Sequence, residues 1–478
     1  MSDPSRTLRA DLPFRRPAVV LSGAGALGAY TVGVLKTLGE AGLQPAVVAG
    51  VSAGAINAVA WAAHAFRTTA LEKVWARLTP AGIGLRWLNL MLRVAGGFIL
   101  VFAGIELVLT LTGSAELSLA RLLARRGTEG TVLKVVLEVV AWALVGVAGW
   151  AISRYANLVE EWLFRLSPAA HSGQEKRLLI VLLAGVVFHL VTWIGGYSWP
   201  HRFSAAVLLA LTAVWLTNRP GRAGDRVRGL LLRLMPETQG RGLWRGRARR
   251  LLLERLVAAG DPGRLAAGEP HLILCACALD SARVTHFVNW KPDDAFQAAI
   301  AKQLGEVVVV RSPAEVMAAA AASSAMPVVF EPVRVFGKDY VDAGGFSNQP
   351  IHAVLADEAD AAVVVLVSPS QGPKDSEHPL TVVDLIGRLL ELANWRDLES
   401  ELSHLPAGWS RDDRPARLCV VEPDGILPGG LLRFDPANAR ELMRRGERDA
   451  WTALDRAGWL EPLPGEPVPA PAHQAAPA

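Results

Sequence analysis

The chain has 478 residues, of which 51% are hydrophobic and 20% are charged, and its formal net charge is +4 at pH 7. Its mean hydropathy of +0.28 favours a protein with membrane segments over a wholly soluble one. Three cysteines in this length exclude a disulfide framework and favour a reducing compartment. Residues 1–17 carry charge but no apolar core, so no cleavable signal peptide is predicted.

A glycine-rich loop follows the first predicted strand, residues 18–21. The loop runs Ser22-Gly23-Ala24-Gly25-Ala26-Leu27-Gly28, and a helix is predicted from residue 31 to about residue 40. Backbone N–H groups at such a helix start suit a developing negative charge. The stretch from Gly23 to Gly28 also fits the G-x-G-x-x-G pattern of a dinucleotide site. That alternative is disfavoured because no acidic residue follows the next strand, where a ribose would be held.

A serine stands between the next predicted strand and helix, in the sequence Gly50-Val51-Ser52-Ala53-Gly54. The apolar run 46–49 precedes it, and a helix-like stretch, 55–61, follows. Glycines on both sides allow the close backbone approach that a nucleophile elbow requires. The pattern predicts Ser52 as the nucleophile of an acyl transfer. The alternative is an ordinary Gly-Ser turn between a strand and a helix.

A long apolar region, residues 85–217, follows the serine. It contains four segments that we predict to be transmembrane helices: 94–112, 132–152, 178–197 and 203–217. The third has twenty residues without a formal charge, enough to cross the core of a bilayer, whereas the fourth has only fifteen. Tryptophan and tyrosine residues lie in the second segment and at the end of the third, as is typical of membrane interfaces. The alternative is a buried helical cap on a soluble enzyme.

A basic segment, 218–256, comes next. Residues 218–255 contain eleven Arg and three acidic residues, a net charge of +8. Beside membrane segments, such a stretch is predicted to be cytoplasmic and to bind anionic lipid head groups. Nucleic acid is the disfavoured alternative, because the leucine triplets at 230–232 and 251–253 favour an amphipathic helix at a membrane surface. An even number of spans would bring both halves of the chain to the cytoplasmic side.

The C-terminal part is predicted to supply an acidic catalytic residue. A hairpin over residues 333–345 ends in Asp342-Ala343-Gly344. An Asp held there by tight backbone suits the role of base for a serine, although an Asp in an ordinary turn is the alternative. The other predicted elements are paired strands at 272–279 and 283–290 with buried thiols at Cys275 and Cys277, a parallel core strand at 361–368, a helix at 381–402 and a disordered proline-rich tail at 463–478.

Taken together, these blocks resemble the patatin-like phospholipase family. Residues 22–30 resemble its oxyanion loop, Gly50–Gly54 its serine elbow, and Asp342-Ala343-Gly344 its Asp-Gly-Gly/Ala motif. Residues 322–332 resemble the segment that precedes the family's aspartate. The resemblance covers the first 65 residues and about 270–370. It implies a three-layer α/β/α hydrolase domain with a Ser-Asp dyad and no catalytic histidine.

The resemblance also implies roles for individual residues. Ser52 and Asp342 would be catalytic, and the backbone of Gly23, Ala24, Gly25 and Ala53 would form the oxyanion hole. The remaining motif positions are Gly28, Gly50, Gly54, Ala343 and Gly344. No metal or organic cofactor is implied. His352 is the alternative third member of a Ser-Asp-His triad, against the plainer interpretation of a surface or helix-start histidine.

Three positions depart from the family pattern. Ala24 replaces the middle glycine of the oxyanion loop, Leu27 stands where a basic residue is usual, and Ala343 replaces the glycine after the aspartate. An alanine adopts positive φ less readily than glycine, so Ala343 implies either a negative φ or a distorted site. These departures keep open a non-catalytic module that binds lipid or a partner protein.

The prediction as a whole is an α/β hydrolase domain split by a membrane insertion. Its two halves would be residues 1–84 and 257–460, separated by the insertion 85–217 and the linker 218–256, with a disordered tail at 461–478. The predicted function is hydrolysis of phospholipid or lysophospholipid acyl esters by a multi-pass protein of a bacterial inner membrane, its catalytic domain facing the cytoplasm. Acyl transfer and thioester cleavage by the same dyad are alternatives. The sequence predicts neither the oligomeric state nor the particular lipid.

Overall fold

The computed structural model describes residues 6–83, parts of 93–108, and residues 131–155, 246–281, 283–371, 382–409 and 414–462. The chain divides into two compact units. The first comprises Met1–Leu85 and Gln239–Ala478, and the second is Arg86–Thr238. Residues 218–245 and 463–478, which belong to the predicted linker and tail, lie outside the described residues.

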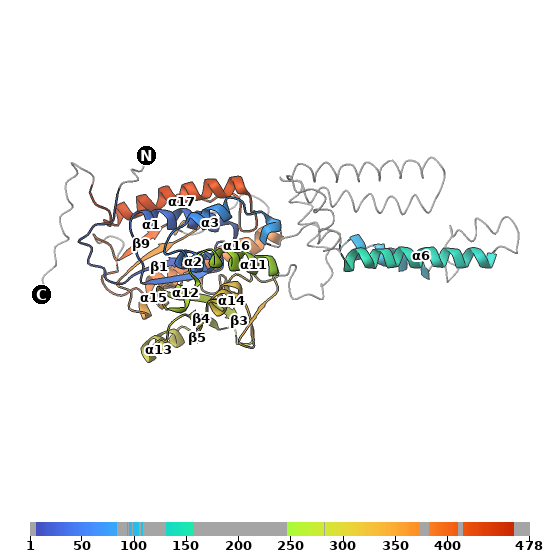
Figure 1. Cartoon of the computed structure of the whole chain (residues 1–478), viewed down its shortest axis with the longest axis horizontal. Coiled ribbons are helices and arrows are strands. Elements are labelled where there is room, and N and C mark those ends of the chain that lie inside the picture. Colours follow the sequence, from blue (N-terminus) through green and yellow to red (C-terminus); the bar gives the residue numbers. More distant parts are fainter. Residues whose placement is uncertain are drawn as a thin grey trace. The chain divides into compact units, whose positions relative to one another are not determined.

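The first unit is built on a mixed β-sheet (Figure 1). The described residues form nine strands in the order β5-β4-β3-β2-β1-β8-β9, with β7 paired to both β3 and β6. The strands are β1 (Pro17–Leu21), β2 (Val47–Val51), β3 (His271–Ala278), β4 (Val284–Val288), β5 (Gly305–Val309), β6 (Val333–Val335), β7 (Lys338–Asp342), β8 (Ala361–Val365) and β9 (Leu418–Val421).

The centre of the sheet is parallel and fully buried. Strands β3, β2, β1, β8 and β9 are parallel neighbours, whereas β4 and β7 run antiparallel to β3. Strands buried on both faces are expected to be continuous apolar runs, and the sequences of β2 and β8, VVAGV and AAVVV, are of this kind. The predicted strands at 18–21 and 46–49, the paired strands at 272–279 and 283–290, the hairpin and the parallel strand at 361–368 are confirmed.

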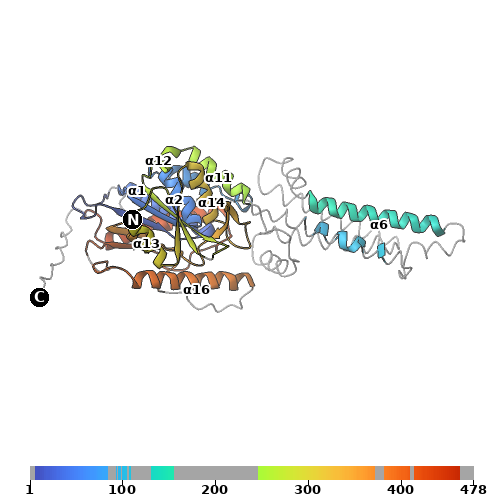
Figure 2. The same cartoon turned by 90° about the horizontal axis from the view of Figure 1, so that it is seen from below.

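Helices cover both faces of the sheet. The helices of the first unit are α1 (Gly28–Glu40), α2 (Ala53–Ala63), α3 (Thr69–Trp75), α11 (Arg247–Ala258), α12 (Pro262–Ala266), α13 (Asp294–Lys302), α14 (Pro313–Ser323), α15 (Ile351–Ala356), α16 (Val382–Ser403) and α17 (Pro436–Arg456), with 3-10 turns η1 (Gly25–Leu27) and η2 (Pro80–Ile83). One face packs on α13, α15 and α16 through Ile300, Val354 and Leu398. The other packs on α2 and α14. Figure 2 shows α16 on the side of the sheet opposite α11 and α12. The predicted α/β class is confirmed.

Two glycines bring α1 and α17 into close contact. A Cβ added to Gly33 of α1 would lie 1.9 Å from the carbonyl oxygen of Met443, and one added to Gly446 of α17 would lie 2.1 Å from that of Tyr30. Each helix therefore presents a bare backbone where the other approaches. The C-terminal helix is in this way fixed against the helix that follows the glycine-rich loop.

The second unit contains α6 (Thr131–Arg154), drawn in teal in Figure 1. It packs against helical residues between 95 and 104 at another pair of facing glycines, because a Cβ on Gly149 would lie 2.8 Å from the carbonyl oxygen of Gly96. The rings of Phe102 and Trp142 lie edge to face nearby, with centroids 5.8 Å apart.

The structure does not support the predicted transmembrane helix at 132–152. Within the described residues, no helix combines the length and the apolar character needed to span a bilayer. The predicted segments 178–197 and 203–217 lie outside the described residues, as do parts of 94–112.

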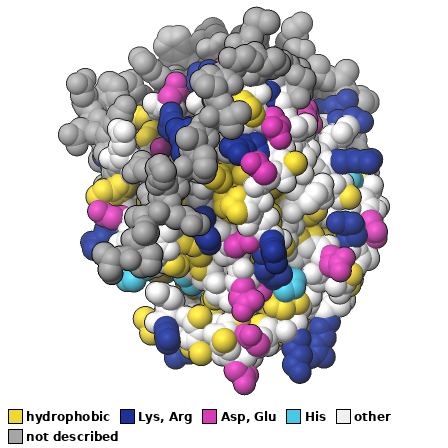
Figure 3. All heavy atoms as spheres, turned by 90° about the vertical axis from the view of Figure 1, so that its left-hand side faces the viewer, with side chains coloured by type: hydrophobic (Ala, Val, Ile, Leu, Met, Phe, Trp, Pro, Cys, Tyr) yellow, Lys and Arg dark blue, Asp and Glu magenta, His cyan; other side chains and the backbone are white. Residues whose placement is uncertain are grey.

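The end of the predicted basic linker is part of the first unit. Residues 247–256 belong to helix α11, whose Leu253, Leu256 and Val257 are buried. Elsewhere on this unit, positive and negative side chains are interspersed on the face drawn in Figure 3. That part of the surface therefore lacks the single-sign field that binding of a polyanion uses.

Candidate active site

The register of three strands brings Ser52 and Asp342 together across 290 residues of sequence. Ala276 and Cys277 of β3 pair with both β4 and β7, so these two strands lie on opposite edges of β3. Strand β7 pairs with the same edge of β3 as β2, just beyond the point where β2 ends with Val51 opposite Cys275. Asp342 pairs with Ala276, one residue further on. The last residue of β7 therefore meets the turn that follows β2.

Ser52 lies in a strained turn between β2 and α2. Its φ and ψ are 57° and −125°, a region that non-glycine residues rarely adopt. The flanking glycines make this turn possible, because a Cβ on Gly54 would lie 2.4 Å from the carbonyl oxygen of Leu21. One on Gly50 would lie 2.7 Å from that of Gly54. This geometry is that of a nucleophile elbow.

Asp342 is a buried carboxyl group beside the Ser52 side chain. Only 6% of Asp342 is exposed. Burial raises its pKa to about 6, while the Ser52 side chain, the Gly344 N–H and the charge of Arg249 act in the opposite direction. The Gly344 N–H donates to Asp342 Oδ1 at 2.8 Å. A carboxylate with this pKa beside a serine is suited to accept the serine proton near neutral pH.

The C-terminal end of α14 holds both residues from behind. The Ser52 N–H donates to Ser323 Oγ at 2.9 Å, and the Asp342 N–H donates to the carbonyl oxygen of Ala325 at 2.9 Å. The last residue of α14 and a residue just after it thus fix the backbone of the nucleophile and of its base. The sequence signal for this was the resemblance of residues 322–332 to the segment that precedes the family's aspartate.

The glycine-rich loop leaves some N–H groups free and occupies others. The Gly23 N–H donates to Asn348 Oδ1 at 2.7 Å, so it has a partner in this structure. The Ala26 N–H donates to the carbonyl oxygen of Leu431 at 2.7 Å. The N–H groups of Ala24, Gly25 and Ala53 have no acceptor among the described residues. These three are the free donors among the four predicted oxyanion-hole residues.

A comparison with protein-family models identifies the family of this chain. The family model described as "Patatin-like phospholipase" matches residues 19–355. The chain belongs to the patatin-like phospholipase family. As a member of this family it is a lipid acyl hydrolase. The comparison with curated proteins finds no match. The crystal structure of VipD from Legionella pneumophila is similar at 13% identity and a TM-score of 0.33, covering 94% of this chain and 70% of that chain.

The departures from the patatin-like motif are accommodated by the backbone. Ala343 is fully buried and is not among the residues with positive φ, so the negative-φ alternative holds and no glycine is required there. Ala24 has a φ of −141°, which alanine adopts freely. Gly28 does need to be small, since an added Cβ would lie 2.9 Å from the ring of Trp75. Leu27 lies buried in η1 rather than at the surface.

Two further residues of this patatin-like site were not singled out by the sequence. Asn57 of α2 donates to the carbonyl oxygen of Gly28 and accepts from Trp75 Nε1, each at 3.0 Å. Asn348 follows the Asp342 motif, and its own N–H donates to Asp397 Oδ2 of α16 at 2.7 Å. Both tie the glycine-rich loop to a helix. A single polar residue, whether in a helix such as Asn57 or in a loop such as Asn348, has no periodic signal that would mark it in one sequence.

His352 has a different set of partners from the one a catalytic triad requires. Its Nδ1 pairs with Glu401 of α16, and its ring lies edge to face with that of His286, with centroids 5.4 Å apart. Cys275 and Cys277 are buried free thiols, as predicted. No group of three or more His, Cys, Asp or Glu side chains in the described residues is arranged to hold a metal ion.

Proposed function

We propose that this lipid acyl hydrolase works through a Ser52–Asp342 dyad. The observation that carries the proposal is a serine in a strained elbow beside a buried carboxyl group, whose pKa burial raises to about 6 while the Ser52 side chain lowers it. Neither feature favours stability, because the elbow stores backbone strain and the buried charge is costly. Such features are expected where they serve a reaction.

In the proposed mechanism, Ser52 Oγ attacks the carbonyl carbon of an acyl ester while its proton passes to Asp342. The N–H groups of Ala24, Gly25 and Ala53 stabilise the oxyanion that forms. Asp342 then returns the proton to the departing alcohol, which leaves an acyl ester on Ser52. A water molecule, activated by Asp342 in its ionised form, hydrolyses this ester and frees the serine. The Gly23 N–H can donate to the oxyanion only if its hydrogen bond to Asn348 Oδ1 breaks.

The proposed substrates are acyl esters of phospholipids or lysophospholipids. The family match supports the lipid class. Membrane association, a cytoplasmic location and binding of anionic head groups by residues 218–255 stay predictions. In that basic segment, Arg249 is buried, whereas Arg247, Arg250 and Arg255 are exposed.

A fluorophosphonate serine probe tests the dyad directly. We expect the wild-type protein to be labelled, and labelling to be lost in Ser52→Ala and reduced at least about a thousandfold in rate in Asp342→Asn. Labelled wild-type protein should then release fatty acid from phosphatidylcholine or lysophosphatidylcholine vesicles. A folded wild-type protein that neither labels nor releases fatty acid would instead favour the non-catalytic binding module.

A further inference from the structure

Arg249 is a buried residue of the first unit, and the proposed mechanism does not explain why it is buried. It lies in the first turn of α11, the first described helix after residues 86–238. Only 4% of it is exposed, whereas its neighbours Arg247 and Arg250 are exposed. Burying an arginine is costly unless hydrogen bonds and charges compensate for lost hydration. The hydrogen bonds and charges that compensate for the burial of Arg249 therefore indicate its role.

The guanidinium of Arg249 caps the C-terminal end of α14. It donates to the carbonyl oxygen of Ser324 and, at 3.1 Å, to that of Ala321. Its Cζ also lies 4.3 Å from the centre of the Phe330 ring. Carbonyls at a helix C-terminus lack intrahelical donors and carry partial negative charge, so a cation there is favourable. Both hydrogen bonds end on main-chain oxygens, so the contact fixes backbone position.

The capped turn is the one that holds the dyad. Ser323 accepts the Ser52 N–H, and Ala325 accepts the Asp342 N–H. Arg249 therefore binds the residue between these two anchors and a residue one turn earlier. A shift of this turn would move the nucleophile and its base together or apart. Errors of about 1 Å in such alignments cost on the order of a hundredfold in rate.

Arg249 also supplies the one charge that acts on Asp342 among the described side chains. Its attraction opposes the effect of burial and lowers the pKa of that carboxyl. Arg249 keeps its own charge, because burial together with Arg250 lowers its pKa only to about 10, and Asp342 partly offsets them. Asp342 is thus ionised at a lower pH than burial alone would allow.

We propose that Arg249 is a positioning residue for the Ser52–Asp342 dyad, which it holds by capping α14 and by its charge near Asp342. The inference rests on the proposed dyad and extends it to a residue that the chain supplies just after the insertion. Arg249 touches neither reacting side chain, so it acts through the turn at residues 321–325.

The test is the pH dependence of fluorophosphonate labelling of Ser52, measured with thermal unfolding for each variant. Arg249→Met keeps length and removes the charge and both donors. We expect its plateau rate to fall about tenfold or more and its acidic midpoint to rise by about one pH unit. Arg249→Lys keeps the charge, so its midpoint should stay within about 0.3 units of wild type, with a plateau rate lowered about threefold. The matched control, Arg250→Met, should match wild type.

The outcomes separate this inference from the proposed function. If the wild type is not labelled at Ser52, the dyad fails. If the wild type is labelled and a folded Arg249→Met has the same midpoint and rate, the positioning role is wrong. If Arg249→Met does not fold, the labelling rates of Ser323→Ala and Arg249→Lys test the positioning role instead. Ser323→Ala is expected to label about tenfold more slowly with an unchanged midpoint. Wild-type rates in both would overturn the inference.

Discussion

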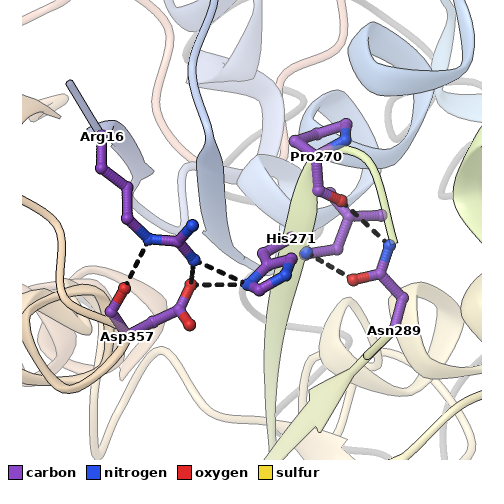
Figure 4. Close-up of polar contacts among 6 residues, drawn as sticks. Arg16, Pro270, His271, Asn289 and Asp357 are labelled. Atoms are coloured by element: carbon purple, nitrogen blue, oxygen red, sulfur yellow. Dashed lines mark hydrogen bonds and ion pairs between the residues drawn. The ribbon is translucent and has the colours of Figure 1, made fainter. Parts of the chain in front are cut away.

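The two ends of the parallel strands treat a buried carboxylate in opposite ways. At the amino ends of β1, β3 and β8, Asp357 Oδ2 lies 2.7 Å from Arg16 Nη2 and 2.8 Å from His271 Nδ1, and its carbonyl oxygen accepts from Arg16 Nε (Figure 4). At the other end, Asp342 has no ion-pair partner among the described side chains, and burial raises its pKa to about 6. At the amino ends, the ion pairs of Asp357 stabilise the fold. At the carboxyl ends, the lack of such pairs leaves Asp342 available as a proton acceptor.

The same contrast extends to the backbone. At the amino ends, the side chain of Asn289 satisfies three main-chain groups, among them the Leu272 N–H at 2.7 Å and the Pro270 carbonyl oxygen at 3.0 Å (Figure 4). At the carboxyl ends, Ser52 has positive φ, and the N–H groups of Ala24 and Ala53 have no acceptor among the described residues. Catalysis is expected to use donors and strain that stability alone would remove.

The largest effect should come from filling the elbow. Gly54→Ala would place a Cβ 2.4 Å and 2.7 Å from the carbonyl oxygens of Leu21 and Ser22, and backbone cannot move aside as a side chain does. We expect a loss of more than about 4 kcal/mol in the free energy of unfolding, or no folded protein. Gly425→Ala is the matched control, because nothing lies within 4 Å of its added Cβ. Equal unfolding curves for the two variants would contradict the close approach.

Asp342→Asn should slow labelling at least about a thousandfold and yet stabilise the protein. A raised pKa means that the folded state binds the proton more tightly than the unfolded state, so stability falls as pH rises from about 4 to about 6. Above that range the whole penalty for the buried charge is present, at most about 3 kcal/mol. Urea unfolding at pH 8 should show a higher midpoint for the variant, and this gain should vanish near pH 4.

The paired end should respond in stability and not in rate. Asp357→Ala removes the partner of Arg16 and His271, and we expect a loss of about 2 kcal/mol with unchanged labelling of Ser52. Asp11→Ala is the matched control, since Asp11 also lies 2.7 Å from an arginine but its side chain is 68% exposed, against 10% for Asp357. We expect no measurable loss of stability for the control, because solvent screens an exposed ion pair. A large rate effect of Asp357→Ala would show that the two ends are coupled.

The unpaired end should respond to pH. Because Asp342 must be ionised to accept the serine proton, the labelling rate should fall about tenfold for each pH unit below about 6. Asp397 is a second buried carboxyl whose pKa burial raises to about 6, so its variant is the necessary control. Asp397→Asn should keep the acidic limb at the same pH. A limb that disappears in this variant would assign the titration to Asp397.

The smallest effect should come from restoring the glycine of the family motif. Ala343 is buried with negative φ, so Ala343→Gly removes a packed methyl group and adds freedom to the unfolded chain. We expect a loss of about 1 kcal/mol in the free energy of unfolding and a labelling rate within about twofold of wild type. An increase of tenfold or more would mean that the alanine distorts the site.

The sequence predicts the local parts of this site well and the long-range parts poorly. Ser52 and its glycines form one continuous block, and the turn chemistry of that block specifies the elbow by itself. Asp342 was found in the same way, from a hairpin followed by small residues. Ser52 and Asp342 meet because β4 and β7 pair with opposite edges of β3. No local sequence pattern predicts this pairing. Here the family resemblance supplied what the pattern did not.

Arg249 shows what the composition of a charged segment does not predict. The excess of arginine in residues 218–255 predicted a basic segment that binds lipid head groups, whereas Arg249, one of the described arginines of that segment, is buried. The helical periodicity of α11 indicates that Arg249 is buried. Arg249, Leu253, Leu256 and Val257 have the spacing i, i+4, i+7 and i+8 of one helix face. Average charge over a window hides a single residue on the apolar face.

The arrangement of β8 against β1 has a consequence for where this protein can be cut. The family match ends at residue 355, before β8, β9, α16 and α17. A protein truncated there would lose the strand that pairs with residues 17–21 and the helix that packs on α1 through Gly33 and Gly446. It would expose an apolar strand edge able to pair with another chain, and so would tend to aggregate. The folding unit is longer than the matched motif, and recombinant protein should extend at least through α17.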